Sequence, residues 1–394
     1  MKELYSNVNI VGGGLIGAAT AISLCKLGYS ITILEKNPTY KFGNNHLDKR
    51  TVAISEGTKL FLSKINVWGE LSKYAEPINR IKIIDRESTN TLNFDNERRN
   101  SNLGYIIKNK KLLDVLYRII LDEKKIKIFN NNLISRIQKN DQKIHIETQR
   151  HKIISDLNIA ADGKNSQIRE ILKTNLYKKN YNKKAIVINF SHSKNHENTA
   201  YEFFYKDGPL AILPMKSENN KNVSSIVWTN NNDYSNSLNK LPDERLRIIL
   251  NEKIEKYIGN VLKIYSKQLF PLSAHLNVKF YDNKTIYVGD SAHSFHPIAG
   301  QGWNLGMKDI ENLYEICLDY KRLGIEIGND NFCKKYHNNT FYRAYSLYQV
   351  TDKLDNLFQQ NSHILNFARS VGINIIQKNN YIKNAISDFA MGFN

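Results

Sequence analysis

Three glycines near the N-terminus, Gly12, Gly14 and Gly17, have the G-x-G-x-x-G spacing of a dinucleotide-binding turn. Gly12 permits a tight turn, Gly14 lets the backbone approach a pyrophosphate, and Gly17 permits close packing of a helix on a strand. Glu35 follows at the end of the next predicted strand, where its carboxylate can accept hydrogen bonds from ribose hydroxyls. The set predicts dinucleotide binding but does not by itself distinguish FAD from NAD.

A second set of candidates follows two later predicted strands. Asp162 begins an Asp-Gly turn, which alone is uninformative. Asp290 ends a strand, where a carboxylate can accept hydrogen bonds from two hydroxyls of a sugar-alcohol chain. Gly300, Gln301 and Gly302 then open a helix, whose free N–H groups and positive end suit the anionic edge of a reduced flavin.

The elements that must position these residues are short apolar strands and the helices after them. Residues 8–11 read as a buried strand, an Ala-rich helix runs to Leu27 with Gly28 as its cap, and residues 30–34 form a second strand. Residues 157–161 and 285–288 are further strands. The pattern is the strand–turn–helix–strand unit that a dinucleotide site requires.

Two other chemistries share the region around residue 290. Gly289 to His293 partly imitates a nucleophile elbow with Ser291 at its centre, but the bulky His293 occupies the final glycine position. Asp290, His293 and His296 suggest metal ligands, but they do not share one helical face, and a proline follows them. We therefore expect no metal site and no serine nucleophile here.

The motifs together resemble the flavin-dependent aromatic hydroxylases with a glutathione-reductase-type FAD fold. In particular, they resemble the ubiquinone-biosynthesis hydroxylases of the 2-octaprenylphenol and 2-octaprenyl-6-methoxyphenol type. Besides the first glycines, the segments that carry the resemblance are D-x-R-x-x-A at Asp48–Ala53, A-D-G-x-x-S-x-x-R at Ala161–Arg169, the nearly complete late motif at Gly289–Asp309, the strands near 208–214 and 225–228, and Ala390–Gly392. The resemblance covers essentially the whole chain in the family's order. Ser291, Trp303 and Ala160 depart from the family's usual residues, and Trp303 is placed where it could alter the substrate pocket.

The resemblance implies a role for each matching cofactor-binding position. It implies no catalytic base. Gly12, Gly14 and Gly17 would hold the pyrophosphate and Glu35 the adenosine ribose. The remaining positions are Arg50 at the phosphate–ribityl region, Asn109 at the ribityl chain, Asp162 shaping the site, Asp290 at ribityl or pyrophosphate groups, and Pro297, Gly300, Gln301 and Gly302 framing the isoalloxazine.

The implied fold class is α/β. A Rossmann-like FAD domain of the glutathione-reductase type is combined with an α+β substrate domain built on an antiparallel sheet, and C-terminal helices follow. We expect the FAD domain to be discontinuous, with residues 1–72, 100–175 and 275–340, and the substrate domain to comprise residues 73–99 and 176–274. Residues 341–394 would form a helical segment, whose apolar spacing favours packing on the body and leaves membrane or partner contact open.

The implied activity is that of an FAD-dependent monooxygenase. It would hydroxylate a polyprenylated phenol in ubiquinone biosynthesis through a flavin C4a-hydroperoxide, with NAD(P)H or another reductant as electron donor and O2 as co-substrate. A lipophilic phenol is the implied substrate, with peripheral membrane contact and other ubiquinone-biosynthesis proteins as possible partners. Two alternatives stay open: a monooxygenase of small soluble aromatics, and a non-catalytic flavin-binding subunit.

Composition narrows the class without naming a function. The chain has 394 residues with 41% hydrophobic and 24% charged residues, which is typical of globular proteins. Three cysteines without a C-x-x-C pair argue against a disulfide scaffold and fit a reducing compartment, so we expect a cytoplasmic protein. The net charge of +18 comes from scattered lysines and arginines without interleaved aromatics, which argues against nucleic-acid binding and leaves contact with an anionic membrane surface open.

Overall fold

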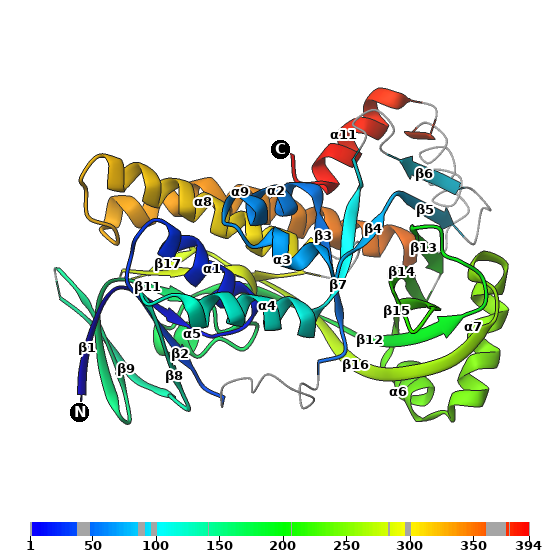
Figure 1. The fold of residues 1–394 in the computed structure, drawn as a ribbon, viewed down its shortest axis with the longest axis horizontal. Coiled ribbons are helices and arrows are strands. Elements are labelled where there is room, and N and C mark those ends of the chain that lie inside the picture. Colours follow the sequence, from blue (N-terminus) through cyan, green and yellow to red (C-terminus); the bar gives the residue numbers. More distant parts are fainter. Residues whose placement is uncertain are drawn as a thin grey trace.

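The computed structural model describes residues 2–37, 48–85, 91–95, 101–140, 142–205, 207–282, 284–295, 301–359, 376–377 and 379–393. Two large sheets lie toward opposite ends of the molecule, and long helices run along one side of both (Figure 1). This mixed architecture confirms the predicted α/β fold class with its antiparallel second sheet and C-terminal helices.

The first sheet carries the predicted dinucleotide unit. Its strand order is β17-β18-β11-β1-β2-β8, and β9 and β10 form a hairpin on β11. The strands are β1 (Lys2–Val11), β2 (Ile31–Glu35), β8 (Ile126–Asn130), β9 (Ile134–Lys139), β10 (Ile144–Thr148), β11 (His151–Ala160), β17 (Tyr281–Asp282) and β18 (Thr285–Tyr287). Strands β1, β2, β8, β11 and β18 run parallel, and Val11 is in register with both Leu34 and Ala160. The carboxyl ends of β1, β2, β11 and β18 therefore meet at one edge.

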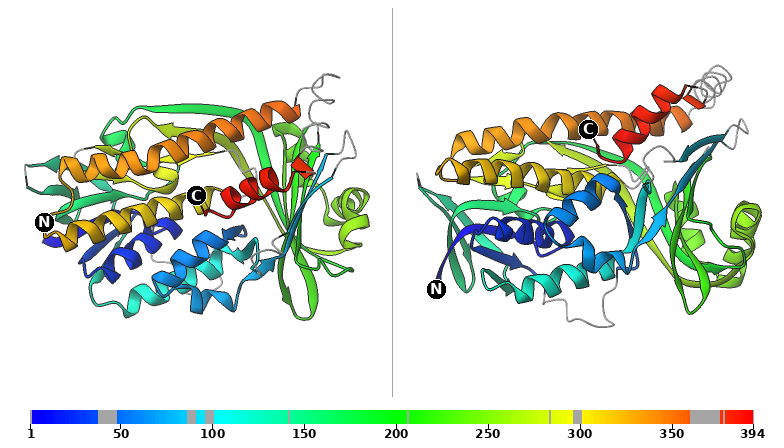
Figure 2. Two further views of the ribbon diagram at one scale, coloured as in Figure 1. Left: turned by 90° about the horizontal axis from the view of Figure 1, so that it is seen from above. Right: turned by 45° about the horizontal axis from the view of Figure 1, so that its top comes forward.

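Helices pack on the first sheet and against one another. They are α1 (Leu15–Lys26), α2 (Glu56–Lys64), α3 (Trp68–Ser72), α4 (Asn109–Asp122), α5 (Gln167–Ile171), α8 (Gln301–Arg322), α9 (Asp330–Gln359) and α11 (Asn380–Ala390). Helix α1 packs against both α4 and α8, and this explains why every residue from Gly17 to Cys25 is buried. Helices α8 and α9 lie side by side (Figure 2).

The second sheet has the order β19-β16-β12-β15-β14-β13-β5-β6. Its strands are β5 (Arg80–Asp85), β6 (Thr91–Asp95), β12 (Leu176–His192), β13 (Thr199–Tyr205), β14 (Gly208–Glu218), β15 (Lys221–Asn231), β16 (Val261–Asn277) and β19 (His293–Ser294). All neighbours are antiparallel except β13 and β5. Helices α6 (Asn232–Lys240) and α7 (Asp243–Ile258) cover one face of this sheet over a core that includes Phe190, Phe203 and Ile226.

A small third sheet joins the two larger parts. It consists of β3 (Thr51–Ser55), β7 (Gly104–Lys108) and β4 (Glu76–Ile78), in the order β3-β7-β4. Helix α9 begins at Asp330 and runs across the boundary expected at residue 340, and the division into domains stays a prediction. In the described part of the chain, no helix is both long enough and apolar enough to cross a bilayer.

Candidate functional site

The glycine turn after β1 is shaped by contacts that leave no room for side chains. Gly12 has a positive φ of 103°, and a Cβ there would collide with the carbonyl of Ala161. A Cβ on Gly17 would collide with the carbonyl of Gly12, so α1 can start close to the strand only because both residues are glycine. Around Gly14 a Cβ would meet nothing within 4 Å, which leaves the N-terminus of α1 open to a ligand.

Glu35 and Tyr117 hold the middle of this turn. The Gly13 N–H donates to Glu35 Oε2 at 2.7 Å, and the Tyr117 hydroxyl donates to the Gly13 carbonyl at 2.7 Å. The Asn37 N–H donates to Glu35 Oε1 at 2.9 Å, so the carboxylate is fixed at the end of β2. Sequence reasoning missed Tyr117, because nothing local marks a residue that reaches the turn from α4.

Arg50 and Asn109 meet at Asp48. Arg50 donates to both Asp48 oxygens at 2.9 and 2.8 Å, and Asn109 Nδ2 donates to Asp48 Oδ2 at 3.0 Å. Burial opposes ionisation of Asp48, but hydrogen bonds from Arg50 and Asn109 outweigh it and lower its pKa to about 2. The buried Asn109 Oδ1 has no partner among the described residues, so it can accept a hydrogen bond from a ligand hydroxyl.

Asp290 lies in a short turn directly after β18. Its side chain is exposed to solvent at the carboxyl end of the strand, although many protein atoms lie near it. Desolvation raises its pKa, while the charges of Arg50 and Lys164, among others, act in the opposite direction. Arg50 and Asp290 are thus within electrostatic reach of each other, which joins the D-x-R motif to the late motif.

Arg169 clamps the turn that presents Asp290. Its guanidinium donates to the carbonyl groups of Asp290 and Ser291, the latter at 2.7 Å, and to that of Lys164. It also contacts His275 Nε2 at 3.0 Å, and burial together with the Arg169 charge lowers the pKa of His275 to about 3. The neutral imidazole can therefore accept this hydrogen bond, and Arg169 acts on the site through the backbone.

Asp162 follows β11 at the same sheet edge. Its Oδ2 accepts from the Ile168 N–H at 3.1 Å, while its buried Oδ1 has no partner in the described part of the chain. Burial raises its pKa. One oxygen thus shapes the local turn, and the other is left to serve a ligand, in keeping with a residue that shapes the FAD site.

Helix α8 begins at Gln301, beside the third sheet. Asn304 anchors this end, because its Oδ1 accepts from the Ser55 N–H at 2.9 Å and its Nδ2 donates to the Ala53 carbonyl at 2.9 Å. A Cβ on Gly302 would meet nothing within 4 Å, and the buried Trp303 Nε1 lacks a partner among the described residues. Pro297 and Gly300, also predicted to contact the flavin, lie outside the described residues.

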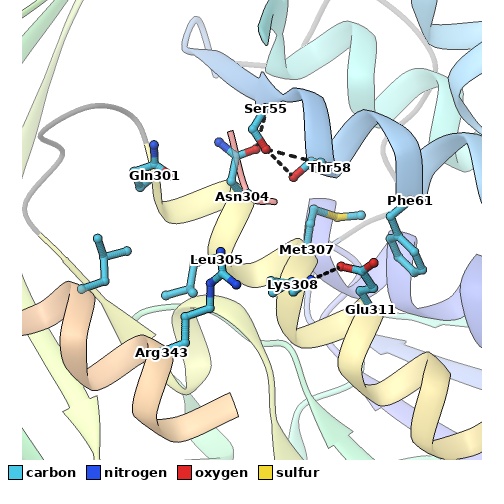
Figure 3. Close-up of a pocket in the computed structure, with 13 residues that line it drawn as sticks. Ser55, Thr58, Phe61, Gln301, Asn304, Leu305, Met307, Lys308, Glu311 and Arg343 are labelled. Carbon is cyan, nitrogen blue, oxygen red and sulfur yellow. Dashed lines mark hydrogen bonds and ion pairs between the residues drawn. The ribbon is translucent and has the colours of Figure 1, made fainter. Parts of the chain in front are cut away.

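A small pocket lies beside the first turns of α8 (Figure 3). Polar side chains from α2 and α8 line it, with Arg343 of α9 opposite them. Gly392 of the C-terminal segment also lines it. The pocket is too narrow for a flavin or a lipid. We assign it no ligand.

The geometry argues against both alternative chemistries. The Ser291 hydroxyl is buried and donates to the Ala160 and Val288 carbonyls, so it is not presented as a nucleophile. His293 Nε2 lies 2.7 Å from Asp309 Oδ2, which also accepts from the Gly289 N–H at 2.9 Å. Within the described ranges, no three His, Cys, Asp or Glu side chains converge to hold a metal ion, and His296 lies outside them.

The described residues fit FAD at both of its ends. Glu35 and the open turn at Gly14 suit an adenosine diphosphate, and Asp290 with Asn109 suits a chain of hydroxyls. The unsatisfied buried oxygens of Asn109 and Asp162 need hydrogen-bond donors, which a ligand can supply. Asp48 is a further member of the site; it was visible in the sequence as the first residue of the D-x-R motif.

Comparisons with known proteins agree with this fit. A family model described as FAD binding domain matches residues 5–319. A ubiquinone hydroxylase, UbiL, of Rhodospirillum rubrum is 28% identical over 400 residues, covering 99% of this chain and 90% of that protein. The 3-demethoxyubiquinol 3-hydroxylase of Escherichia coli K12 is 24% identical, with 100% of both chains covered. Among solved structures, p-nitrophenol 4-monooxygenase of Pseudomonas putida superimposes with a TM-score of 0.78 at 15% identity, covering 99% of this chain and 98% of that one.

Proposed function

This chain belongs to the FAD-binding-domain family and is an FAD-dependent monooxygenase, and from that premise we propose that it hydroxylates the ring of a polyprenylated phenol in ubiquinone biosynthesis. The observation that carries the proposal is the full-length similarity to ubiquinone hydroxylases, which spans both large sheets and the C-terminal helices. FAD, O2 and a reductant such as NAD(P)H are the cofactor, co-substrate and electron donor of this class of enzyme.

FAD, when bound, supplies the redox chemistry by which O2 delivers one oxygen atom to an aromatic ring. The chain's own groups bind and orient it. We assign the adenosine ribose to Glu35, the pyrophosphate to the Gly12–Gly17 turn with the N-terminus of α1, and the ribityl region to Asp290, Arg50 and Asn109. All of these groups line the carboxyl edge of the first sheet or contact Asp48 beside it.

The start of α8 is suited to the charged edge of the flavin. Gln301 and Gly302 stand at its first turn, where free N–H groups and the positive helix end favour an anion. Asn304 fixes this turn against β3. We include the neighbouring Pro297 and Gly300 in the proposed frame of the isoalloxazine on the strength of the motif alone.

In this proposal the second sheet covers the reaction site from the other side. Asn189 Nδ2 donates to the Lys49 carbonyl at 2.7 Å, and Arg50 lies over the Phe270 ring at 4.9 Å, so β12 and β16 face the segment that contains Arg50. A protein wall at this place excludes water from the reacting ring.

Contact with a membrane surface is a further part of the proposal, because the substrate is lipophilic. Helices α9 and α11 expose large side chains on the outside, with Tyr342 71% and Tyr381 85% exposed. Strong basic charge would favour anionic lipids. Co-sedimentation with vesicles of anionic phospholipid tests this contact, and protein that stays in the supernatant at low salt would argue against it.

The decisive experiment combines a gene deletion with oxygen labelling. Cells that lack the protein should lose mature ubiquinone under aerobic growth and accumulate a lipophilic intermediate one hydroxyl short. In the purified reaction, label from 18O2 and not from H2 18O should enter the ring. Normal ubiquinone in cells without a second hydroxylase would reject this substrate and favour a soluble aromatic. Absence of oxygen uptake with every phenol tested would favour a non-catalytic subunit.

A further inference from the structure

One row of residues crosses the second sheet on the face opposite α6 and α7. Residues that are directly opposite in neighbouring strands point to the same face of a sheet. The strand register aligns six such positions, from β5 to β16: Ile83, Glu202, Ala211, Val227, Val187 and Gln268. Apart from Val187, these side chains are partly accessible, whereas Tyr201 and Phe203, next to Glu202 on β13, are buried against α7.

This row extends across the sheet away from the predicted flavin site. At one end, Gln268 Oε1 accepts from the Lys49 N–H at 3.1 Å, next to Arg50. At the other end, Ile83 packs in a cluster that includes Met391 and Phe393 of the C-terminal segment. Glu202 and Gln268 are four strands apart, which is about 19 Å along a sheet and leaves room for a substituted ring between them.

Glu202 is the one ionisable residue in this row. Its carboxyl group has no hydrogen-bond or ion-pair partner among the described residues, although it is only partly accessible. On the same face, β14 contributes Pro209, Ala211 and Leu213, none of which is charged, and β5 contributes the buried Asp85 opposite Phe204. Burial alone raises the pKa of Glu202 to about 8, so the group is mostly protonated at neutral pH.

A partly accessible carboxyl group that lacks a protein partner among the described residues, and that has apolar neighbours in its row, can take a hydrogen-bonding ligand. We propose that the carboxyl group of Glu202 binds the ring hydroxyl of the aromatic substrate, while the apolar residues of the row receive the ring. A protonated carboxyl group has one donor and one free acceptor oxygen, so it pairs with a hydroxyl in both directions. An ether oxygen in the same place carries no proton, so it can only accept a hydrogen bond. The inference rests on the proposed function, because it takes a phenol as the substrate.

The test measures binding rather than turnover. A phenol that carries a short prenyl chain and its methyl ether are titrated separately into the FAD-loaded protein, and binding is followed by the change in flavin absorbance. The wild type should bind the phenol about tenfold more tightly than the ether, the order expected for one buried hydrogen bond. Glu202→Leu should bind both equally, and Glu202→Gln should lie between them. Glu197→Gln is the matched control, since Glu197 is exposed and its carboxylate pairs with Arg80 on the surface.

The outcomes separate this inference from the proposed function. If the wild type binds neither compound, the phenol substrate fails and the Glu202 role fails with it. If the wild type binds both compounds alike, or if Glu202→Leu still prefers the phenol tenfold, only the Glu202 role is overturned. If Glu202→Leu does not fold, the isosteric Glu202→Gln and the shorter Glu202→Asp replace it in the test. A preference for the phenol over the ether that is unchanged in both variants also overturns the Glu202 role.

Discussion

At the scale of single residues, the carboxyl groups discussed above are in two different states. Asp48 is held ionised by Arg50, whereas Asp290 and Glu202 are surrounded by protein and have raised pKa values. The first stabilises the chain, and the other two are better explained by a ligand than by folding. Substitution of Asp290 or Glu202 should therefore weaken ligand binding without lowering the stability of the ligand-free fold.

Asp290→Ala should weaken FAD retention about ten- to a hundredfold, because a charge-assisted hydrogen bond contributes about 1.5–3 kcal/mol. The melting temperature of the FAD-free protein should stay the same or rise, since the lost carboxylate is desolvated in the fold. Equilibrium dialysis of FAD and thermal melting measure the two quantities. An unchanged FAD affinity would contradict the assigned role, and Glu197→Gln serves as the neutral control.

Glu202 should make stability depend on pH. Its pKa rises from an ordinary 4.5 to about 8 on folding, so the folded state binds an extra proton between these values. The free energy of unfolding therefore falls as the pH rises through this window. Glu202→Gln does not show this decrease, because glutamine does not ionise. Urea unfolding measures how much more stable Glu202→Gln is than the wild type. This difference in unfolding free energy should be small at pH 4.5, grow up to pH 8 and then stay constant. An advantage that is equal at pH 5 and pH 9 would show that the carboxyl group is solvated.

At the scale of elements, the C-terminal segment is tied to the start of α2. The Gly57 N–H donates to the Met391 carbonyl at 2.8 Å, and Met391 is buried in the cluster that also contains Ile78 and Ile106. This segment therefore packs at the Ile83 end of the row that contains Glu202.

Gly57→Ala should detach this segment, because its Cβ would lie 2.8 Å from the carbonyl oxygens of Met391 and Gly392. We expect faster hydrogen exchange at residues 391–393 and weaker binding of the prenylated phenol, with FAD content unchanged. Gly69→Ala is the control, since a Cβ there meets nothing within 4 Å. Equal exchange in both variants would show that the contact with Gly57 does not hold the segment in place.

At the scale of the whole molecule, one ligand connects segments that are distant in the chain. FAD at 100 times its Kd should stabilise the fold by about 2.7 kcal/mol, or about 3 °C in melting temperature for a chain of this size. FMN should give a much smaller shift, because it lacks the adenosine that Glu35 is placed to bind. Equal shifts with both flavins would refute the assignment of Glu35.

Much of the fold was predictable because its rules are local. The first strand, helix and second strand follow from apolar runs, glycine spacing and a capping residue, and they appear as β1, α1 and β2. The strands near residues 208–214 and 225–228 were also predicted and appear as β14 and β15. The addition of β5 to β13 as a parallel neighbour was not predicted, because pairing between distant strands leaves no periodic pattern in either of them.

The sequence by itself determined that the chain binds a dinucleotide, since each glycine of the turn meets a steric demand that a short motif expresses completely. Only the tertiary structure decided which distant groups complete the site. Tyr117 reaches Gly13 from α4, and Asp48 joins Arg50 to Asn109. Five paired strands place Glu202 in the same row as Gln268. Such contacts depend on strand register and helix packing, and these are settled by the burial of whole surfaces rather than by any neighbouring residue.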